Sequence, residues 1–247
     1  MILNAFVDFT RSPLFKYLIT SIFIVVLVLV IFLLHKKEGQ VHSRKYVIKR
    51  LAIVASFSAI SIILYIFGID IKIFIPYMPS FLEVHFSLIP IYVIVALYGP
   101  GYASIAIIIR TLGKFLFVSS SSFGVGELAD IIIGLSVVLV FYVIFVNTSK
   151  KNKLLYALIA SALVWIFVGV FINWTIIIPF YVHLMLDGNV NALVGMMSTI
   201  PGINASNYMG IYLLVACLPF NAIAASINSF LSFFVIKGLS KVFIDNK

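Results

Sequence analysis

The stretch GVGELADIIIGLSVVLVFYVIFV, from Gly124 to Val146, decides the fold class of this chain. Gly124, Gly126 and the two carboxylates, Glu127 and Asp130, lead into an apolar run that contains no further charged residue. A helix needs about 20 predominantly apolar residues to cross the hydrocarbon core of a bilayer. The stretch therefore predicts a membrane-spanning helix over residues 128–146 that begins close to one membrane surface, at its carboxylates.

The remainder of the chain has the same apolar character. Of its 247 residues 63% are hydrophobic, and the mean hydropathy is +1.21, whereas soluble domains are only about half apolar. Apolar runs recur along the chain, and no hydrophilic stretch is long enough to form a separate soluble domain. The sequence thus predicts an all-α, polytopic membrane helix bundle with seven helices, at residues 17–34, 47–68, 86–98, 102–117, 128–146, 154–180 and 208–235.

The third and fourth of these helices are short and are joined by Gly99-Pro100-Gly101. Glycine and proline in this arrangement are typical of a tight turn. The sequence therefore predicts a helical hairpin at this point, whose two arms need not cross the bilayer completely.

The basic residues predict how the bundle is oriented. The chain has 17 Lys and Arg residues against 8 Asp and Glu, a formal net charge of +9. Short cytoplasmic loops of membrane proteins are rich in Lys and Arg, so the charge does not indicate nucleic-acid binding, and the basic side is predicted to be cytoplasmic. Twelve basic residues fall on that side: Lys36, Lys37, Arg44, Lys45, Lys49, Arg50, Lys150, Lys151, Lys153, Lys237, Lys241 and Lys247. Longer, sparsely charged loops on the other side can cover a ligand.

The sequence lacks the common motifs of catalytic sites. It contains no G-x-x-x-x-G-K-[ST] phosphate loop, no H-E-x-x-H zinc pair and no G-x-S-x-G nucleophile elbow. It also lacks the paired broken helices expected of a self-sufficient secondary transporter. We therefore expect no enzymatic activity, metal or cofactor, while a structural membrane protein without a ligand stays open as an alternative.

Four charged residues near the predicted outer surface have two possible roles. Glu127 lies in the first turn of its helix, where a carboxylate stabilises the unpaired N–H groups, or it contacts a ligand. Asp130, one turn deeper, is predicted to face a polar cavity. Arg110 and Lys114 share one helix face and either pair with these carboxylates or extend their side chains to the membrane interface.

Two asparagines lie within apolar runs, Asn173 in FINWTIIIPFY and Asn221 in LPFNAIAAS. An amide in hydrocarbon needs partners for its donors and its acceptor. The pair therefore forms either helix–helix hydrogen bonds or a planar polar edge for a ligand. Ala55 and Ala59, four residues apart, are typical of a helix face that allows close approach of another membrane helix.

Taken together, these segments resemble the substrate-binding S components of energy-coupling factor (ECF) vitamin transporters, most closely the riboflavin-type members. The resemblance runs from about Leu51 to the C-terminus. It rests on the order and spacing of five segments: the A-x-x-x-A of Ala55 and Ala59, Gly99-Pro100, GVGELADIIIGLS from Gly124, NWTIIIPFY from Asn173, and LPFN ending at Asn221.

This resemblance implies a six-helix S-component domain over residues 46–247, preceded by an extra transmembrane helix and a basic loop in residues 1–45. It implies a subunit of the bacterial plasma membrane that captures a vitamin outside the cell. The subunit then docks on a T component and two ATPase subunits, which use ATP, and topples to release the vitamin inward. Ala55 and Ala59 would lie on the docking face, Asn173 and Asn221 would contact the ligand, and residues 71–83 would form a lid.

Two departures from the riboflavin-type pattern bear on the substrate. Ala224 stands where these members commonly have Lys, and His85-Phe86-Ser87-Leu88 replaces D-F-S-D. We expect His85 and Asp130 to replace the lost polar contacts, with riboflavin as the first candidate and another vitamin or precursor as the alternative. Tyr77 and Phe81 could stack on the rings of the ligand. The predicted substrate-binding residues are therefore Asn173, Asn221, Asp130, Glu127, His85, Tyr77, Phe81 and Glu83.

Overall fold

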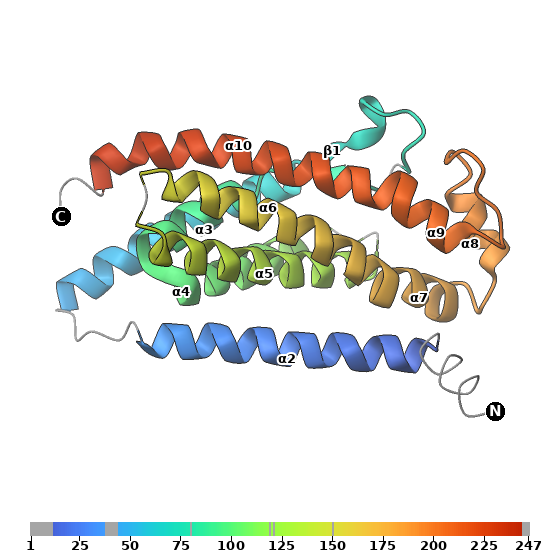
Figure 1. The fold of residues 1–247 in the computed structure, drawn as a ribbon, viewed down its shortest axis with the longest axis horizontal. Coiled ribbons are helices and arrows are strands. Elements are labelled where there is room, and N and C mark those ends of the chain that lie inside the picture. The colour runs from blue at the N-terminus through green and yellow to red at the C-terminus, as the bar shows by residue number, and fades with distance from the viewer. Residues whose placement is uncertain are drawn as a thin grey trace.

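The computed structural model describes residues 12–37, 44–79, 81–118, 120, 122–149 and 151–243. Its long helices lie side by side in one bundle (Figure 1). They are α2 (Pro13–Lys37), α3 (Arg44–Ile66), α4 (Leu88–Phe117), α5 (Val125–Asn147), α6 (Lys153–Ile172) and α10 (Leu218–Phe243).

Short elements lie between and beyond these helices. The connection from α3 to α4 contains the antiparallel strands β1 (Ile69–Asp70) and β2 (Glu83–Val84) and the 3₁₀ turn η1 (Ile71–Ile73). After α6 the chain continues through η2 (Asn173–Ile177), α7 (Ile178–Phe180), η3 (Tyr181–Met185) and α8 (Val190–Met196). It returns through α9 (Tyr208–Ile211) and η4 (Tyr212–Cys217) into α10. The segments η2, η3 and η4 are π-helical.

Helix α4 is the predicted hairpin. Gly99 has non-helical dihedrals, with φ 80° and ψ −179°, a region that is essentially restricted to glycine. Nη1 of Arg110 donates to Oγ of Ser87 at 2.9 Å, although a straight helix would separate these residues by about 34 Å. The chain therefore reverses at Gly99-Pro100-Gly101, and α4 contributes two short arms.

The two ends of the bundle differ in character. We call the end with β1, β2 and α8 the outer end, and the end with the α5–α6 connection and the end of α10 the inner end (Figure 1). Six of the twelve basic residues have described side chains, and the rest, which include Lys150 and Lys247, lie outside the described residues or side chains. The helix order places all six at the inner end: Arg44, Lys49, Arg50, Lys151, Lys153 and Lys237. The positive-inside rule still predicts that this end is cytoplasmic.

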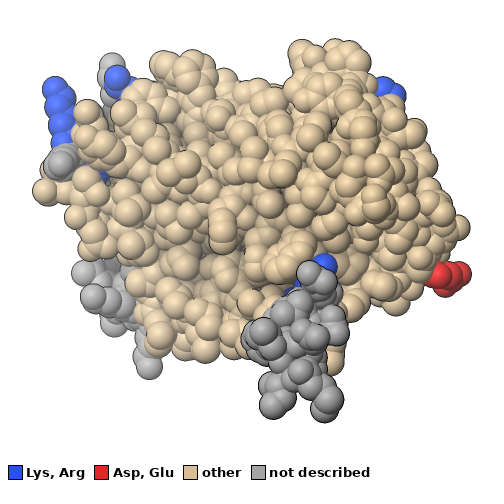
Figure 2. Space-filling view, turned by 45° about the vertical axis from the view of Figure 1, so that its right-hand side comes forward, with Lys and Arg blue, Asp and Glu red and all other residues tan. Residues whose placement is uncertain are grey.

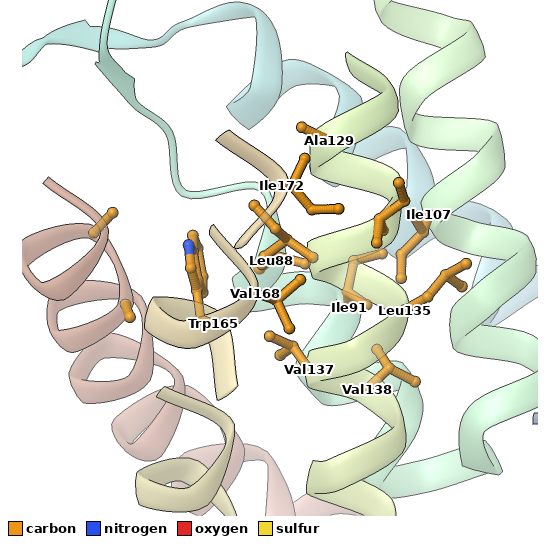
Figure 3. Packing of buried hydrophobic residues seen from close by; sticks show 14 of the residues in the cluster. Leu88, Ile91, Ile107, Ala129, Leu135, Val137, Val138, Trp165, Val168 and Ile172 are labelled. Atoms are coloured by element: carbon orange, nitrogen blue, oxygen red, sulfur yellow. The ribbon is translucent and has the colours of Figure 1, made fainter. Parts of the chain in front are cut away.

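The core consists of aliphatic and aromatic side chains from α4, α5, α6 and α10. Figure 3 shows how side chains from both arms of α4 meet those of α5 and α6, with Ile91, Ile107, Val137, Val138 and Ile172 among the labelled residues. Each of these five side chains is fully buried. This packing fixes α5 and α10, which carry Glu127, Asp130 and Asn221, and the end of α6, from which the chain continues into η2 and Asn173.

The surface of the bundle is apolar as well. Figure 2 shows a face on which a broad area carries no acidic or basic side chain, and many large aliphatic and aromatic residues are exposed. Among the described residues, six helices are long and apolar enough to cross a membrane, with the α4 hairpin counted once. The protein is a multi-pass membrane protein with the predicted all-helical fold.

The sixth predicted helix extends further than expected. Instead of ending near Phe180, the helical run continues to Met185 through two π-helical segments around Pro179. The N–H of Ile178 bonds to the carbonyl of Asn173, five residues earlier. Local π adjustments of this kind let a membrane helix accommodate proline, which explains why Pro179 does not end the run.

The hairpin turn leads to a first prediction. Replacing Gly99 with alanine should lower the free energy of unfolding by about 1–3 kcal/mol, because a Cβ is strained at these dihedrals. Gly210→Ala in α9 is the matched control, since a Cβ there meets no atom within 4 Å. Thermal unfolding in detergent measures both variants, and equal stability of the two would contradict the proposed turn geometry.

Candidate substrate-binding site

The two predicted amides lie towards the outer end of the bundle. Asn173 follows Lys153 by 20 residues along α6 and η2, or about 30 Å of helix, which is the thickness of the hydrocarbon core. Asn173 therefore lies near the outer membrane boundary and not at the centre of the bilayer. Asn221 lies in the first turn of α10, which also begins at the outer side.

Asn173 links two helical runs and, through Tyr212, the predicted lid, residues 71–83. Its Oδ1 accepts a hydrogen bond from the hydroxyl of Tyr212 in η4 at 2.9 Å, and its Nδ2 donates to the carbonyl of Gly169 at 2.8 Å. The ring of Phe81 from the lid lies 6.4 Å from the Tyr212 ring. The side chain of Tyr212 thus connects the lid to the Asn173 amide.

Asn221 packs against the same part of α6. Its Nδ2 donates to the carbonyl of Cys217 at 2.8 Å, within its own helix. A Cβ at Gly169 would come within 2.3 Å of Oδ1 of Asn221, so only glycine allows the amide to lie this close. Gly169 therefore contacts both asparagines, because its carbonyl also accepts from Asn173.

A second polar cluster surrounds Asp130. The carboxylate of Asp130 accepts a hydrogen bond from the Tyr65 hydroxyl of α3, and Nε2 of His85 lies 3.3 Å from its Oδ2. Nδ1 of His85 is 3.0 Å from Oγ of Ser87. The side chain of Asp130 is 30% exposed and that of His85 is 13% exposed. The cluster can therefore be reached from outside the bundle.

Arg110 supports this cluster from below the surface. It is fully buried, and its guanidinium lies over the Tyr65 ring at 4.6 Å, while Nη2 is 3.5 Å from the carbonyl of Asp130. The alternative in which Arg110 extends to the membrane interface is therefore wrong. A buried guanidinium needs a partner, and here hydroxyl, carbonyl and aromatic groups supply it.

Glu127 forms a separate contact that closes the loop before α5. Its Oε1 pairs with Nζ of Lys114 at 3.2 Å, and its Oε2 accepts hydrogen bonds from Ser120 at 2.8 Å and Ser122 at 3.0 Å. Its side chain is only 5% exposed. The structure thus places Glu127 as the acceptor that joins α4, the loop and α5.

The structure brings some of the predicted residues together and separates others. Phe81 meets Asn173 through Tyr212, and His85 meets Asp130 directly. Tyr77 and Glu83 are exposed, and Glu83 lies beside Gly68, where a Cβ would be 2.9 Å from its Oε2.

Sequence reasoning missed three residues that complete these contacts. Tyr212 and Tyr65 link candidate residues across helices, and Nδ2 of Asn228 donates to the His85 carbonyl at 3.1 Å. Asn228 follows Asn221 by seven residues and therefore lies on the same face of α10, a signal that was present in the sequence. Nothing in the sequence marked the two tyrosines.

Two hollows open on the membrane-facing surface. One of about 650 Å³ is lined by α6, Trp174, Leu213 and Leu218, and one of about 310 Å³ lies between α2 and α6. Both are lined by aliphatic and aromatic side chains. This lining suits hydrocarbon chains and lacks the polar groups that a water-soluble ligand requires.

Comparison with known proteins decides the family. The model of the family "ECF transporter, substrate-specific component" matches residues 49–236. The chain belongs to the family of ECF transporter S components. It is therefore the substrate-binding membrane subunit of a transporter and not an enzyme.

Individual relatives agree with this assignment. The S component is 27% identical to the riboflavin transporter RibU of Staphylococcus aureus (strain TCH60) over 181 residues, which is 73% of this chain and 85% of the relative. A solved structure described as the S component of a bacterial ECF transporter matches with a TM-score of 0.58 and 24% identity. That match covers 78% of this chain and 96% of the other, and it shows the shared fold.

The contacts of Glu127 in this S component lead to a second prediction. Glu127→Gln should lower the free energy of unfolding by about 1–3 kcal/mol, because Lys114 and two serines lose their charged acceptor. Affinity for the transported ligand should change little, since the carboxylate is already occupied by protein donors. Asp187→Asn, which alters an exposed carboxylate at the same end, is the control. Loss of affinity at unchanged stability would instead make Glu127 a ligand contact.

Proposed function

We propose that this S component captures riboflavin at its outer end and delivers it inward by docking on a T component and two ATPase subunits. The observation that carries the proposal is the pair of buried amides, Asn173 and Asn221, held against Gly169 on neighbouring helices. The similarity to a riboflavin transporter at 27% identity supports the choice of ligand.

The amide pair suits a flat heterocycle with donors and acceptors on its edge. Each asparagine amide offers both a carbonyl acceptor and an N–H donor. Asn173 and Asn221 donate to carbonyls of their own helical runs. Each of these bonds runs from a side-chain amide to the carbonyl four positions earlier in the same helical run. A ligand can therefore replace them without breaking a contact between helices or unfolding the helix.

The other predicted residues offer further groups for such a ligand. Phe81 and Tyr77 present aromatic rings on the lid, and rings of this kind pack against planar ligands. The cluster of His85 and Asp130 offers polar atoms that remain partly exposed. We propose that these atoms contact the hydroxyl groups of the ligand. They would thereby take the role of the Lys that riboflavin-type members commonly have at the position of Ala224.

The proposed docking face is open in the structure. Ala55 and Ala59 are both exposed on α3, whereas the inward face of α3 carries the buried residues Val54, Ser58 and Tyr65. Helix α2 packs against α4, α5 and η2 and leaves Ala55 and Ala59 uncovered. We propose that residues 46–247 form the transport domain and that residues 1–45 add a helix on another face.

The third prediction tests the amide pair. Asn173→Leu and Asn221→Leu should each weaken riboflavin binding by roughly 5- to 150-fold, because a lost polar partner costs about 1–3 kcal/mol. Asn147→Leu is the control, since the Asn147 side chain is exposed at the end of α5 and donates to Val143. Isothermal titration of the purified variants in detergent measures the affinities.

Two results of that titration would contradict parts of the proposal. Unchanged affinity in both asparagine variants would remove the proposed site. Absence of riboflavin binding by the wild-type protein would reject riboflavin, and mass spectrometry of co-purifying small molecules would then identify the vitamin or precursor that takes its place.

The fourth prediction tests the docking face. Ala55→Trp and Ala59→Trp should abolish riboflavin uptake by cells, because a large side chain prevents close helix approach. Binding by the isolated S component should persist, since both residues point away from the core. Leu29→Trp on the exposed side of α2 should leave uptake intact. Equal loss of binding and uptake in the alanine variants would place this face inside the protein's own core.

A further inference from the structure

Helix α2 lies outside the residues that match the family, yet one of its faces is built into the bundle. Its buried residues recur at helical spacing: Lys16, Thr20, Leu27 and Ile31. These residues face α4, α5 and η2, the elements against which α2 packs. Near the inner end, His35 of α2 forms an edge-to-face contact with Tyr102 of α4, with ring centroids 5.8 Å apart. The helix is thus held along most of its length.

The outer part of α2 meets the segment that carries Asn173. Nζ of Lys16 lies 5.3 Å from the centroid of the Trp174 ring, and Lys16 as a whole is only 9% exposed. The Phe23 ring makes an edge contact with Phe171 at 5.8 Å, and Phe171 in turn contacts Trp174 at 6.3 Å. One cation and three aromatic rings therefore connect α2 to the α6–η2 junction.

Trp174 and Asn173 are adjacent in the chain but turn to different partners. Asn173 bonds to Tyr212 inside the bundle, whereas Trp174 contacts Lys16 of α2. Both belong to the π-helical segment η2. Such segments are rare and usually occur as single turns at functional sites, and a less favoured backbone persists only where its surroundings hold it. Contacts on both sides of η2 meet this requirement.

We propose that Lys16 is a positioning residue, through which α2 holds η2 so that the Asn173 amide is presented to the substrate. The inference rests on the proposed role of Asn173 in ligand binding. The ammonium group of Lys16 lies over the Trp174 ring. The contact between Phe23 and Phe171 holds α2 against the last turn of α6, directly before η2. Removing the cation loosens η2 on its membrane side, while the Asn173 side chain keeps its hydrogen bonds to Tyr212 and to the Gly169 carbonyl.

The test compares riboflavin affinity in three lysine variants. Lys16→Met should raise the dissociation constant by roughly 3- to 30-fold, the range expected from loss of a desolvated cation–π contact. Lys16→Arg keeps a cation and should stay within twofold of the wild type. Lys153→Met is the matched control, because Nζ of Lys153 lies 4.4 Å from the Phe145 ring centroid at the inner end. It should also stay within twofold.

A double-mutant cycle separates positioning from general stability. If Lys16 acts through Asn173, then Lys16→Met should have no further effect on affinity in the Asn173→Leu protein. Additive effects, or a change of less than twofold in Lys16→Met alone, would overturn the inference. Phe23→Ala should weaken binding in the same non-additive way, and it serves as the test variant if Lys16→Met does not fold.

A ligand-free measurement distinguishes failure of this inference from failure of the substrate assignment. The chain has two tryptophans, Trp165 and Trp174, so Trp165→Phe leaves Trp174 as the sole tryptophan, which can be excited selectively over the tyrosines. Lys16→Met in that background should shift the emission of Trp174 and increase its quenching by acrylamide. Unchanged emission and quenching would show that Lys16 does not hold this segment, whether or not the wild-type protein binds riboflavin.

Discussion

The structure depends on the lack of hydrogen-bonding partners in the hydrocarbon of a bilayer. Each polar group there must find a partner within the protein, and this chain gathers charged and amide side chains into small clusters towards the outer end. Tyr65 holds the largest of them together, because its hydroxyl bonds to Asp130 and its ring contacts His85. The same ring lies under two cations, Arg110 and Lys114.

This clustering supplies the polar groups that the proposed binding of a polar ligand by a mostly apolar bundle requires. The amides of Asn173 and Asn221 each donate to a carbonyl of their own helical run, so neither leaves its donor unpaired. The π-helical segments η2 and η4 meet at the hydrogen bond between Asn173 and Tyr212. Wider turns of this kind are often found at functional sites, and here the Tyr212 ring of η4 lies 6.4 Å from the Phe81 ring.

The helices and the hairpin could be predicted from the sequence because both signals are local. Apolar run length defines each helix, and Gly99-Pro100-Gly101 defines the reversal within three residues. The candidate site could be predicted less completely from the sequence, because its contacts join positions that are far apart in the chain. Asn228 bonds to His85 across 143 residues, and Tyr212 bonds to Asn173 across 39. The π-helical segments depend on packing around them, which no run of residues encodes by itself.

Burial was the other property that the sequence could not decide. A long cationic side chain near a helix end either reaches the interface or turns inward, and both outcomes have the same sequence pattern. Arg110 is fully buried over Tyr65. Lys114 pairs with Glu127. Which outcome occurs depends on whether partners from other helices lie within reach, and α3 and α5 supply them here.

Helix α3 belongs both to the outer polar cluster and to the exposed small-residue face. Tyr65 lies six residues beyond Ala59, or about 9 Å along the helix axis. The inward side of α3 bonds to Asp130 and, through Ser61, to the carbonyl of Ser87 at 2.6 Å. Its outward side exposes Ala55 and Ala59. A packed helix moves largely as a unit, so a change in the contacts of Tyr65 near the lid shifts the small-residue face as well. The covalent continuity of one helix thus provides a physical route by which occupancy of the proposed site could bias the proposed docking.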